Sequence, residues 1–392
     1  MERARIHEGI RRMRFEDLLG RTERSELSQM EAAELLGISE RTFRRWRDRY
    51  REEGSMGLSD RRLRPSLRRA PKAEIERMLG LYGELYRGFT VKHFHEQLCK
   101  RHNYTLGYTV TKLHLHRAGL VTPARSRSAH RKKRPRRPMV GMMLHQDAST
   151  HAWLPGDNRK YDLVATMDDA TSGVYSLFLV AQEGTASSLR GIREVIERHG
   201  LFCSLYTDRG SHYFETPAAG GRVSKTALTQ CGRALKQLGI EHIAAYSPQA
   251  RGRSERLFAT LQDRLPKELM LAGISTLEAA NRWLRDVYIA EHNARFAVAP
   301  EQEGSAFVAD PTGAWRDILC IREDRRVGND NTVKWRRLTL QLPPSSLRPH
   351  FVRASVRVHE YPDGPLTVFW GPHRLAEYDA EGRIIQQEKR AA

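Results

Sequence analysis

The sequence lacks long apolar runs and has few cysteines. No stretch of its 392 residues approaches the roughly 20 apolar residues that span a bilayer, and the arginine-rich start has no hydrophobic region behind it. Neither export nor membrane insertion is therefore predicted, and a cytoplasmic location is expected. The four cysteines lie far apart and form no C-x-x-C pair, which argues against a zinc site and a disulfide framework; they are Cys99, Cys203, Cys231 and Cys320.

Lysine is scarce throughout, and acidic residues are scarce in the first third. The chain has 12 lysines against 54 arginines, and residues 1–138 carry 34 Lys and Arg against 17 Asp and Glu, whereas residues 139–392 carry 32 against 30. The excess of positive charge predicts a polyanion-binding surface in the first third. Arginine suits bidentate contacts with phosphate, although codon bias in a GC-rich genome would produce the same excess.

Residues 28–51 have the pattern of two helices joined by a short turn. Ser28 with Glu31 forms a capping-box pattern, Gly37 ends the first helix, and Ser39 begins a second helix that is dense in arginine. This pattern predicts a helix-turn-helix unit within residues 1–56 that enters the major groove of DNA, and the alternative is an ordinary amphipathic hairpin. The residues expected to contact DNA are Arg41, Thr42, Arg44, Arg45 and Arg47.

Three apolar patterns within residues 72–122 predict a second helical unit, either another helix-turn-helix or a structural helical domain. Thr90 and Thr109 are the expected caps of its helices. The i, i+2 spacing of its histidines predicts surface or groove residues rather than metal ligands, and these are His93, His95, His114 and His116.

Two basic linkers separate the predicted domains, at residues 57–71 and 123–138. The second linker holds eight Lys or Arg and no acid, so it cannot fold alone and is expected to order on nucleic acid. Its candidate DNA contacts are Arg131, Lys132, Lys133 and Arg134.

Residues 139–310 alternate between strand and helix patterns. Strands are expected in 139–154, 161–166, 174–181, 202–206 and 241–245, and a helix follows with leucines at every fourth residue from Leu257 until Pro266 ends or kinks it. These patterns predict an α/β core with a mixed five-stranded sheet and helices on both faces. Residues 311–392 return to alternating strand patterns, which predict a small β-barrel.

Three acids stand at corresponding places of the predicted core. Asp147 is expected at the end of the first strand, Asp208 at the end of the fourth, and Glu255 in the first turns of the helix after the fifth. Clustered carboxylates repel unless cations neutralise them, and oxygen-only ligation suits two Mg²⁺ or Mn²⁺ ions. Asp168 and Asp169 compete for the first position, but they fall in a hairpin turn remote from the strand end.

Basic residues and histidines flank the three acids. The candidate phosphate contacts are Arg209, Arg251, Arg253 and Arg256, and the alternative for each is plain surface charge. Three histidines could position water or DNA, although a structural role is favoured over ligation; they are His145, His151 and His212.

The segments around these acids resemble a known family. They read His-Gln-Asp-Ala-Ser at Asp147, Tyr-Thr-Asp-Arg-Gly-Ser-His-Tyr at Asp208, and Ser-Pro-Gln-Ala-Arg-Gly-Arg-Ser-Glu-Arg at Glu255. Together they are similar to the Asp-Asp-Glu signature of the retroviral-integrase-like transposases of bacterial insertion sequences, of the ISNCY type. The interval from Asp208 to Glu255 is longer than is common in that family, because residues 214–225 form a Gly/Ala/Pro-rich insertion.

The resemblance implies a ribonuclease-H-like core behind helix-turn-helix units, in a nucleoid-associated protein. It further implies metal-dependent hydrolysis at the element's ends and attack of the freed 3′-hydroxyl on target DNA. Asp147, Asp208 and Glu255 would hold two Mg²⁺ or Mn²⁺ ions. The expected partners are double-stranded DNA, as terminal repeats and target, and further copies of the chain in a dimer or tetramer. Two alternatives are a catalytically inactive DNA-binding regulator and a ribonuclease on RNA–DNA hybrids.

Overall fold

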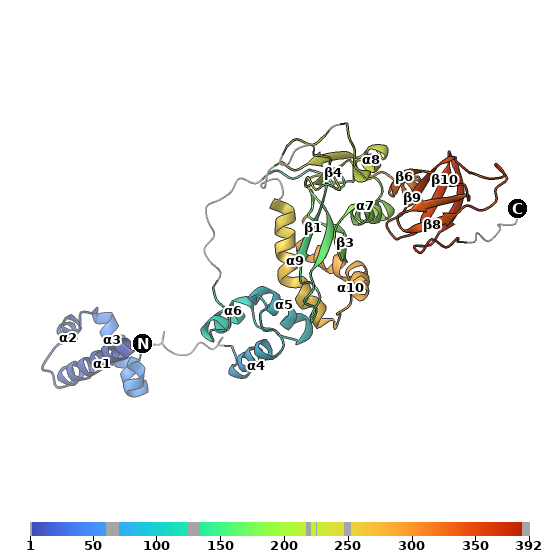
Figure 1. The fold of residues 1–392 in the computed structure, drawn as a ribbon. Coiled ribbons are helices and arrows are strands. Elements are labelled where there is room, and N and C mark those ends of the chain that lie inside the picture. The colour runs from blue at the N-terminus through green and yellow to red at the C-terminus, as the bar shows by residue number, and fades with distance from the viewer. Residues whose placement is uncertain are drawn as a thin grey trace. The chain divides into compact units, whose positions relative to one another are not determined.

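The computed structural model describes residues 2–59, 70–123, 134–216, 221–224, 226–246 and 252–385, with side chains from residue 9 onward. The chain divides into two compact units (Figure 1). One comprises Met1–Leu85 and Leu98–Leu120, and the other comprises Tyr86–Gln97 and Val121–Ala392. The domain boundaries given above remain predictions. No helix within the described ranges is both long and apolar enough to cross a membrane.

The first helices form the predicted helix-turn-helix. Ser28 and Glu31 make the reciprocal capping box, with Ser28 N donating to Glu31 Oε2 at 2.8 Å and Glu31 N donating to Ser28 Oγ at 3.2 Å. Phe15 and Phe43 are fully buried between the helices. The elements are α1 (Glu2–Glu23), α2 (Gln29–Leu35), α3 (Glu40–Glu53) and the short η1 (Gly54–Leu58).

Three helices follow, namely α4 (Lys72–Glu84), α5 (Val91–Arg101) and α6 (Tyr108–Arg117). Thr90 accepts a hydrogen bond from His93 N at 3.4 Å, as expected of a cap. The cap of α6 is Gly107 and not Thr109. His93 is fully buried, so its interpretation as a surface residue was wrong.

The core contains the mixed five-stranded sheet that the sequence predicts. Its order is β3-β2-β1-β4-β5, in which β1 to β3 form an antiparallel meander and β4 and β5 run parallel to β1. The strands are β1 (Leu144–His151), β2 (Tyr161–Asp168), β3 (Val174–Val180), β4 (Ser204–Thr207) and β5 (Glu241–Ala244).

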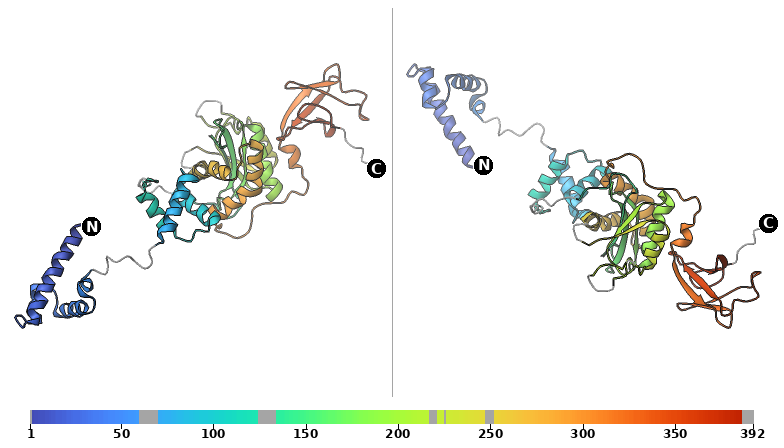
Figure 2. Two further views of the ribbon diagram at one scale, coloured as in Figure 1. Left: turned by 90° about the horizontal axis from the view of Figure 1, so that it is seen from below. Right: turned by 90° about the horizontal axis from the view of Figure 1, so that it is seen from above.

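Helices cover both faces of this sheet (Figures 1 and 2). Leu144 and Leu205 pack with α7 (Thr185–His199) and α8 (Gln230–Gln237) on one face. Leu163 and Ala165 pack on the other face against α9 (Gly252–Leu271), α10 (Leu277–Trp283), the π-helix η4 (Leu284–Tyr288) and α11 (Ile289–Phe296). Pro266 does not end α9, because buried leucines on both sides hold the helix against the sheet.

Two asparagines cover the edge strand β3. Asn281 of α10 accepts from Leu179 N at 2.7 Å and donates to Leu179 O at 2.9 Å. Asn293 of α11 makes the same pair of bonds with Val174 N and Val174 O, both at 2.8 Å. Each amide therefore occupies the place that the backbone of a further strand would take, which blocks this edge against pairing with another chain.

The last part of the chain packs two β-sheets around a shared core containing Trp335, Phe351 and Tyr378. One sheet has the order β11-β10-β9-β6, and the other is the pair β7-β8. The predicted closed barrel is not confirmed, since no hydrogen-bonded ladder joins the two sheets in the described part of the chain. Alternating apolar residues fix which faces pack but not whether the strands close. The elements are α12 (Trp315–Ile318), β6 (Ile321–Arg326), β7 (Thr332–Trp335), β8 (Leu338–Gln341), β9 (Ser355–Glu360), β10 (Leu366–Trp370) and β11 (His373–Tyr378).

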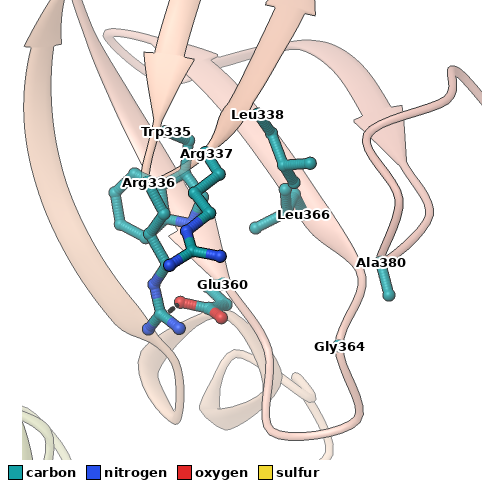
Figure 3. A pocket seen from close by; sticks show the side chains of 8 residues that line it. All are labelled: Trp335, Arg336, Arg337, Leu338, Glu360, Gly364, Leu366 and Ala380. Atoms are coloured by element: carbon teal, nitrogen blue, oxygen red, sulfur yellow. Dashed lines mark ion pairs between the residues drawn. The ribbon is translucent and has the colours of Figure 1, made fainter.

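A hollow of about 320 Å³ opens in this β-rich part. Figure 3 shows Trp335, Arg336 and Arg337 along one wall, with Arg336 paired to Glu360 at 2.6 Å. None of its lining residues belongs to the five-stranded sheet, so the predicted acids lie outside it.

Candidate active site

Asp147 and Asp208 stand on neighbouring parallel strands. The register pairs Leu144 with Leu205 and His145 with Tyr206, and its extension by two residues places Asp147 beside Asp208. Neighbouring strands are about 4.8 Å apart, and residues in register point to the same face. Both aspartates are half-buried. Asp147 lies in the middle of β1 and not at its end, because β1 continues past the point where β4 stops.

A tight turn holds Asp208. Its Oδ1 accepts a hydrogen bond from Gly210 N at 2.9 Å. A Cβ at Gly210 would lie 2.9 Å from His212 Cε1 and 3.1 Å from Asp208 Oδ1, so any larger residue would displace one of these side chains. A larger residue at this position would therefore disturb the candidate site, since it would shift the His212 ring or the Asp208 carboxylate.

The third acid lies on the same side of the sheet. Asp147 pairs with Ala165, whose side chain packs in the cluster formed with α9, so Asp147 faces α9. Glu255 is in the first turn of α9 and is exposed. Gln262, seven residues later and so on the same helix face, donates to Ser149 Oγ of β1 at 2.9 Å. Glu255 therefore lies on the face of α9 that is turned towards β1.

Oxygen donors from carboxylates are the chemistry that Mg²⁺ and Mn²⁺ prefer. Asp147 and Asp208 supply two carboxylates side by side, which fits such an ion. However, the described residues include no group of three or more His, Cys, Asp or Glu side chains arranged to hold a metal. The structure thus brings two of the predicted acids into register and leaves Glu255 apart from them.

The two competing aspartates have different partners. Asp168 is fully buried and accepts from Gly141 N, Thr171 N and Thr171 Oγ1, which makes it a structural anchor of the β2–β3 turn. Asp169 is also fully buried, and it accepts from Arg134, Arg253 and His145 side chains and from Arg137 N. Because Arg253 belongs to the first turn of α9, the β2–β3 turn is not remote from the candidate site.

The surroundings of Asp169 set the protonation states of its partners His145 and Arg253. Burial, with Arg134 and Arg253 nearby, lowers the pKa of His145 to about 3, so this ring is neutral at neutral pH and donates from Nε2 to Asp169 at 2.7 Å. Burial also lowers the pKa of Arg253 to about 10, which leaves its guanidinium charged at neutral pH.

The other basic residues predicted to contact phosphate differ in their surroundings. Arg209 donates to Gly221 O at 2.8 Å and stacks over the Tyr246 ring, whereas Arg256 is exposed. Arg251, Arg131, Lys132 and Lys133 lie outside the described residues. Of the remaining histidines, His151 packs on Trp153, and His212 Nε2 lies 3.4 Å from Glu183 Oε1.

The predicted DNA-reading residues lie on one helix. Arg41, Arg44 and Arg45 are exposed on α3, and Arg44 pairs with Glu40 at 2.8 Å. Thr42 N donates to the cap Ser39 Oγ at 3.3 Å. Arg47 is half-buried and pairs with its neighbour Asp48 at 2.8 Å.

Sequence reasoning missed a buried polar cluster on α9. Glu268 accepts from His93 Nε2 at 2.7 Å and from Gln97 Nε2 at 2.9 and 3.1 Å, and all three side chains are buried. Nearby, Arg264 donates to Glu96 at 2.7 Å. The partners are about 170 residues apart along the chain, so no local spacing signals the cluster.

Comparison with known proteins gives consistent results. Residues 20–66 match a family model described as a helix-turn-helix domain. The chain is 30% identical over 365 residues to "Putative transposase y4bF" of Sinorhizobium fredii (strain NBRC 101917 / NGR234), covering 91% of this chain and 79% of that protein. It is 32% identical over 194 residues to "Transposase for insertion sequence IS1202" of Streptococcus pneumoniae, covering 50% of this chain and 41% of that one.

Among solved structures, the chain is similar to the HTLV-2 integrase catalytic core domain in complex with magnesium. The identity is 16% and the TM-score is 0.28, over 37% of this chain and 86% of that one.

Proposed function

Because the chain belongs to the family of insertion-sequence transposases that includes these relatives, we propose that it binds the ends of its own element, cleaves DNA strands there and joins them to target DNA. The observation that carries this proposal is the parallel register of β1 and β4. It sets Asp147 and Asp208 side by side on the sheet face that α9 covers.

Asp147, Asp208 and Glu255 are the residues that would hold two divalent cations, Mg²⁺ or Mn²⁺. Bound there, the cations would activate the attacking oxygen and stabilise the leaving one in a phosphodiester displacement. Asp147 and Asp208 are held by the backbone, since Ala148 N donates to the first at 3.0 Å and Gly210 N to the second at 2.9 Å. Glu255 would complete the set from the first turn of α9.

The helix-turn-helix would read the element's ends through α3, which presents Arg41, Arg44 and Arg45 on its exposed surface. Arg209 and Arg256 would contact phosphate near the acids. Arg134 and Arg253 are already engaged with Asp169, so their predicted phosphate contacts would compete with that ion pair. Synapsis of two ends would require a dimer or tetramer of the chain.

The test is DNA cleavage with a duplex that carries the two ends of the encoding insertion sequence. We expect Mg²⁺-dependent nicking at the ends by the wild-type chain, and loss of nicking but retained gel-shift binding in Asp208→Asn and Glu255→Gln. Asp263→Asn, on the same helix but paired with Lys267, is the matched control and should cut normally.

Two results would contradict the proposal. If both acid variants cut as well as the parent, the assignment of the site is wrong. If the wild-type chain shifts the duplex but shows no nicking with Mg²⁺ or Mn²⁺, the chain acts as a DNA-binding regulator and not as an enzyme.

A further inference from the structure

We propose that Asp169 is a positioning residue, which anchors the first turn of α9 through Arg253 and thereby sets Glu255 at the level of Asp147. This inference rests on the proposed function, because it assigns Asp169 a role towards the three acids. Asp169 itself would contact neither DNA nor a cation.

The contacts of Asp169 join three separate parts of the core. Its carboxylate is fully buried and pairs with Arg253 of α9, accepts from His145 of β1 at 2.7 Å, and accepts from Arg134 at 2.6 Å. Arg253 also donates to Arg134 O at 2.9 Å. Its guanidinium therefore bridges the carboxylate and a backbone carbonyl, which fixes the helix start more firmly than one contact would.

A second contact anchors α9 further along, where Gln262 bonds Ser149. The two anchors have matching spans. Ser149 follows His145 by four residues of β1, about 13 Å at about 3.3 Å per residue. Gln262 follows Arg253 by nine residues of α9, about 13 Å at 1.5 Å per residue. The helix therefore runs alongside β1 in the same sense and is fixed at both ends of this interval.

This two-point attachment sets the height of Glu255. Glu255 lies seven residues before Gln262, about 10 Å along the helix, and Asp147 lies two residues before Ser149, about 7 Å along the strand. The two acids are thus within about one helical turn of the same level. Without the Asp169–Arg253 anchor, the buried Leu257 and Phe258 and the Gln262 bond would still hold the helix against the sheet. The turn before them, which carries Glu255, would lose its attachment to β1 and fray more readily.

The alternative role for Arg253 is a phosphate contact. The two roles differ in what a substitution changes. Loss of a phosphate contact weakens DNA binding and lowers the salt dependence of binding by about one charge. Loss of an anchor leaves DNA binding unchanged and slows the chemical step, because a displacement of about 1 Å at the reacting groups can cost about 100-fold in rate.

The experiment compares Asp169→Asn, Arg253→Gln and Arg253→Lys with the wild type and with Asp263→Asn as control. Arg253→Gln is included in case Asp169→Asn does not fold. It leaves the Asp169 carboxylate paired with Arg134 and His145, so this buried charge keeps partners. Single-turnover cleavage of the end duplex with Mg²⁺ gives the rate at saturating DNA and the half-saturating DNA concentration. Hydrogen exchange of residues 252–260 is measured without DNA or metal, and thermal melting confirms folding.

We expect Arg253→Gln and Asp169→Asn to lower the saturated rate by about 100-fold, with unchanged half-saturation, and to speed exchange of residues 252–260. Arg253→Lys keeps the positive charge but lacks the forked guanidinium, so its saturated rate and its exchange rate should lie between those of these two variants and the wild type. Asp263→Asn should change neither readout.

Two patterns would overturn the proposal while leaving the proposed function intact. In one, Arg253→Gln weakens DNA binding and its salt dependence at an unchanged saturated rate, which makes Arg253 a phosphate contact. In the other, Arg253→Gln and Asp169→Asn both show wild-type exchange and a wild-type saturated rate, while Asp208→Asn is inactive. Conversely, if Asp208→Asn and Glu255→Gln both cut normally, the proposed function fails, whatever the exchange shows.

Discussion

The sharpest stability prediction concerns the asparagine that covers the edge of the sheet. Asn281→Leu removes both hydrogen bonds to Leu179, whose side chain is buried in β3. Both bonds link the Leu179 backbone N–H and C=O to the Asn281 amide, and a leucine side chain can replace neither. Each buried polar group left without a partner costs about 1–3 kcal/mol.

Asn281 is half-buried, so water can reach part of the vacated space, and the expected loss is about 2–4 kcal/mol in the free energy of unfolding. For a core of this size, this corresponds to a fall of about 5–15 °C in the melting temperature. Differential scanning calorimetry measures this fall, and hydrogen exchange of the Leu179 amide reports the local opening. Size-exclusion chromatography should show added self-association, because an uncovered edge strand pairs with other chains.

The matched control is Asn158→Leu, a substitution in an exposed loop that should stay within about 0.5 kcal/mol of the wild type. If Asn281→Leu has the same melting temperature as this control and its Leu179 amide exchanges at the wild-type rate, the two hydrogen bonds do not protect the edge of the sheet and the reasoning is refuted.

Three further outcomes are expected. Burial, with Arg322 nearby, lowers the pKa of His359 to about 4. The unfolded chain therefore binds this proton at a higher pH than the folded chain does, and the free energy of unfolding falls as pH drops from about 6.5 to 4. His359→Phe should make the fall in melting temperature over this pH range less steep, and an unchanged slope would contradict the assignment. Gly210→Ala should lower the DNA-cleavage rate at least about 10-fold while the melting temperature changes little, because its Cβ meets the Asp208 carboxylate, and wild-type cleavage would show that the turn adapts. Arg41→Ala with Arg45→Ala should weaken binding to the end duplex and reduce the slope of log affinity against log salt by about two, and a slope equal to that of the wild type would remove α3 from the DNA interface.

Local patterns predicted the elements well where neighbouring residues decide the outcome. The capping box of Ser28 and Glu31 forms within one helical turn, so its residues suffice to predict it. The leucines of α9 repeat every fourth residue and pack on the sheet as expected. At Pro266 local rules left two outcomes open, and the structure excludes an end of the helix there, because the flanking leucines hold α9 against the sheet. Local rules could not decide closure of the small β-sheets, because closure depends on pairing between distant strands.

The candidate site also has parts that local sequence predicts and parts that it does not. Sequence motifs alone singled out Asp147, Asp208 and Glu255, and the register of β1 with β4 places the first two together. The hairpin position of Asp169 indicates only that it is remote from the strand end, and it says nothing about where α9 begins. The helix-turn-helix needed no such information, and its match at residues 20–66 agrees with the prediction from 28–51.

The order of residues by itself determined the kinds of element and the face that each buries, and it singled out the three candidate acids, because these depend on spacings of a few residues. Only the tertiary structure decided that His93 and Gln97 enclose Glu268, that Asp169 ties β1 to α9, and that two asparagines close the sheet edge. The physical reason is that such contacts join residues from 24 to 175 positions apart, and their geometry follows from how whole elements pack, which no short stretch of sequence encodes.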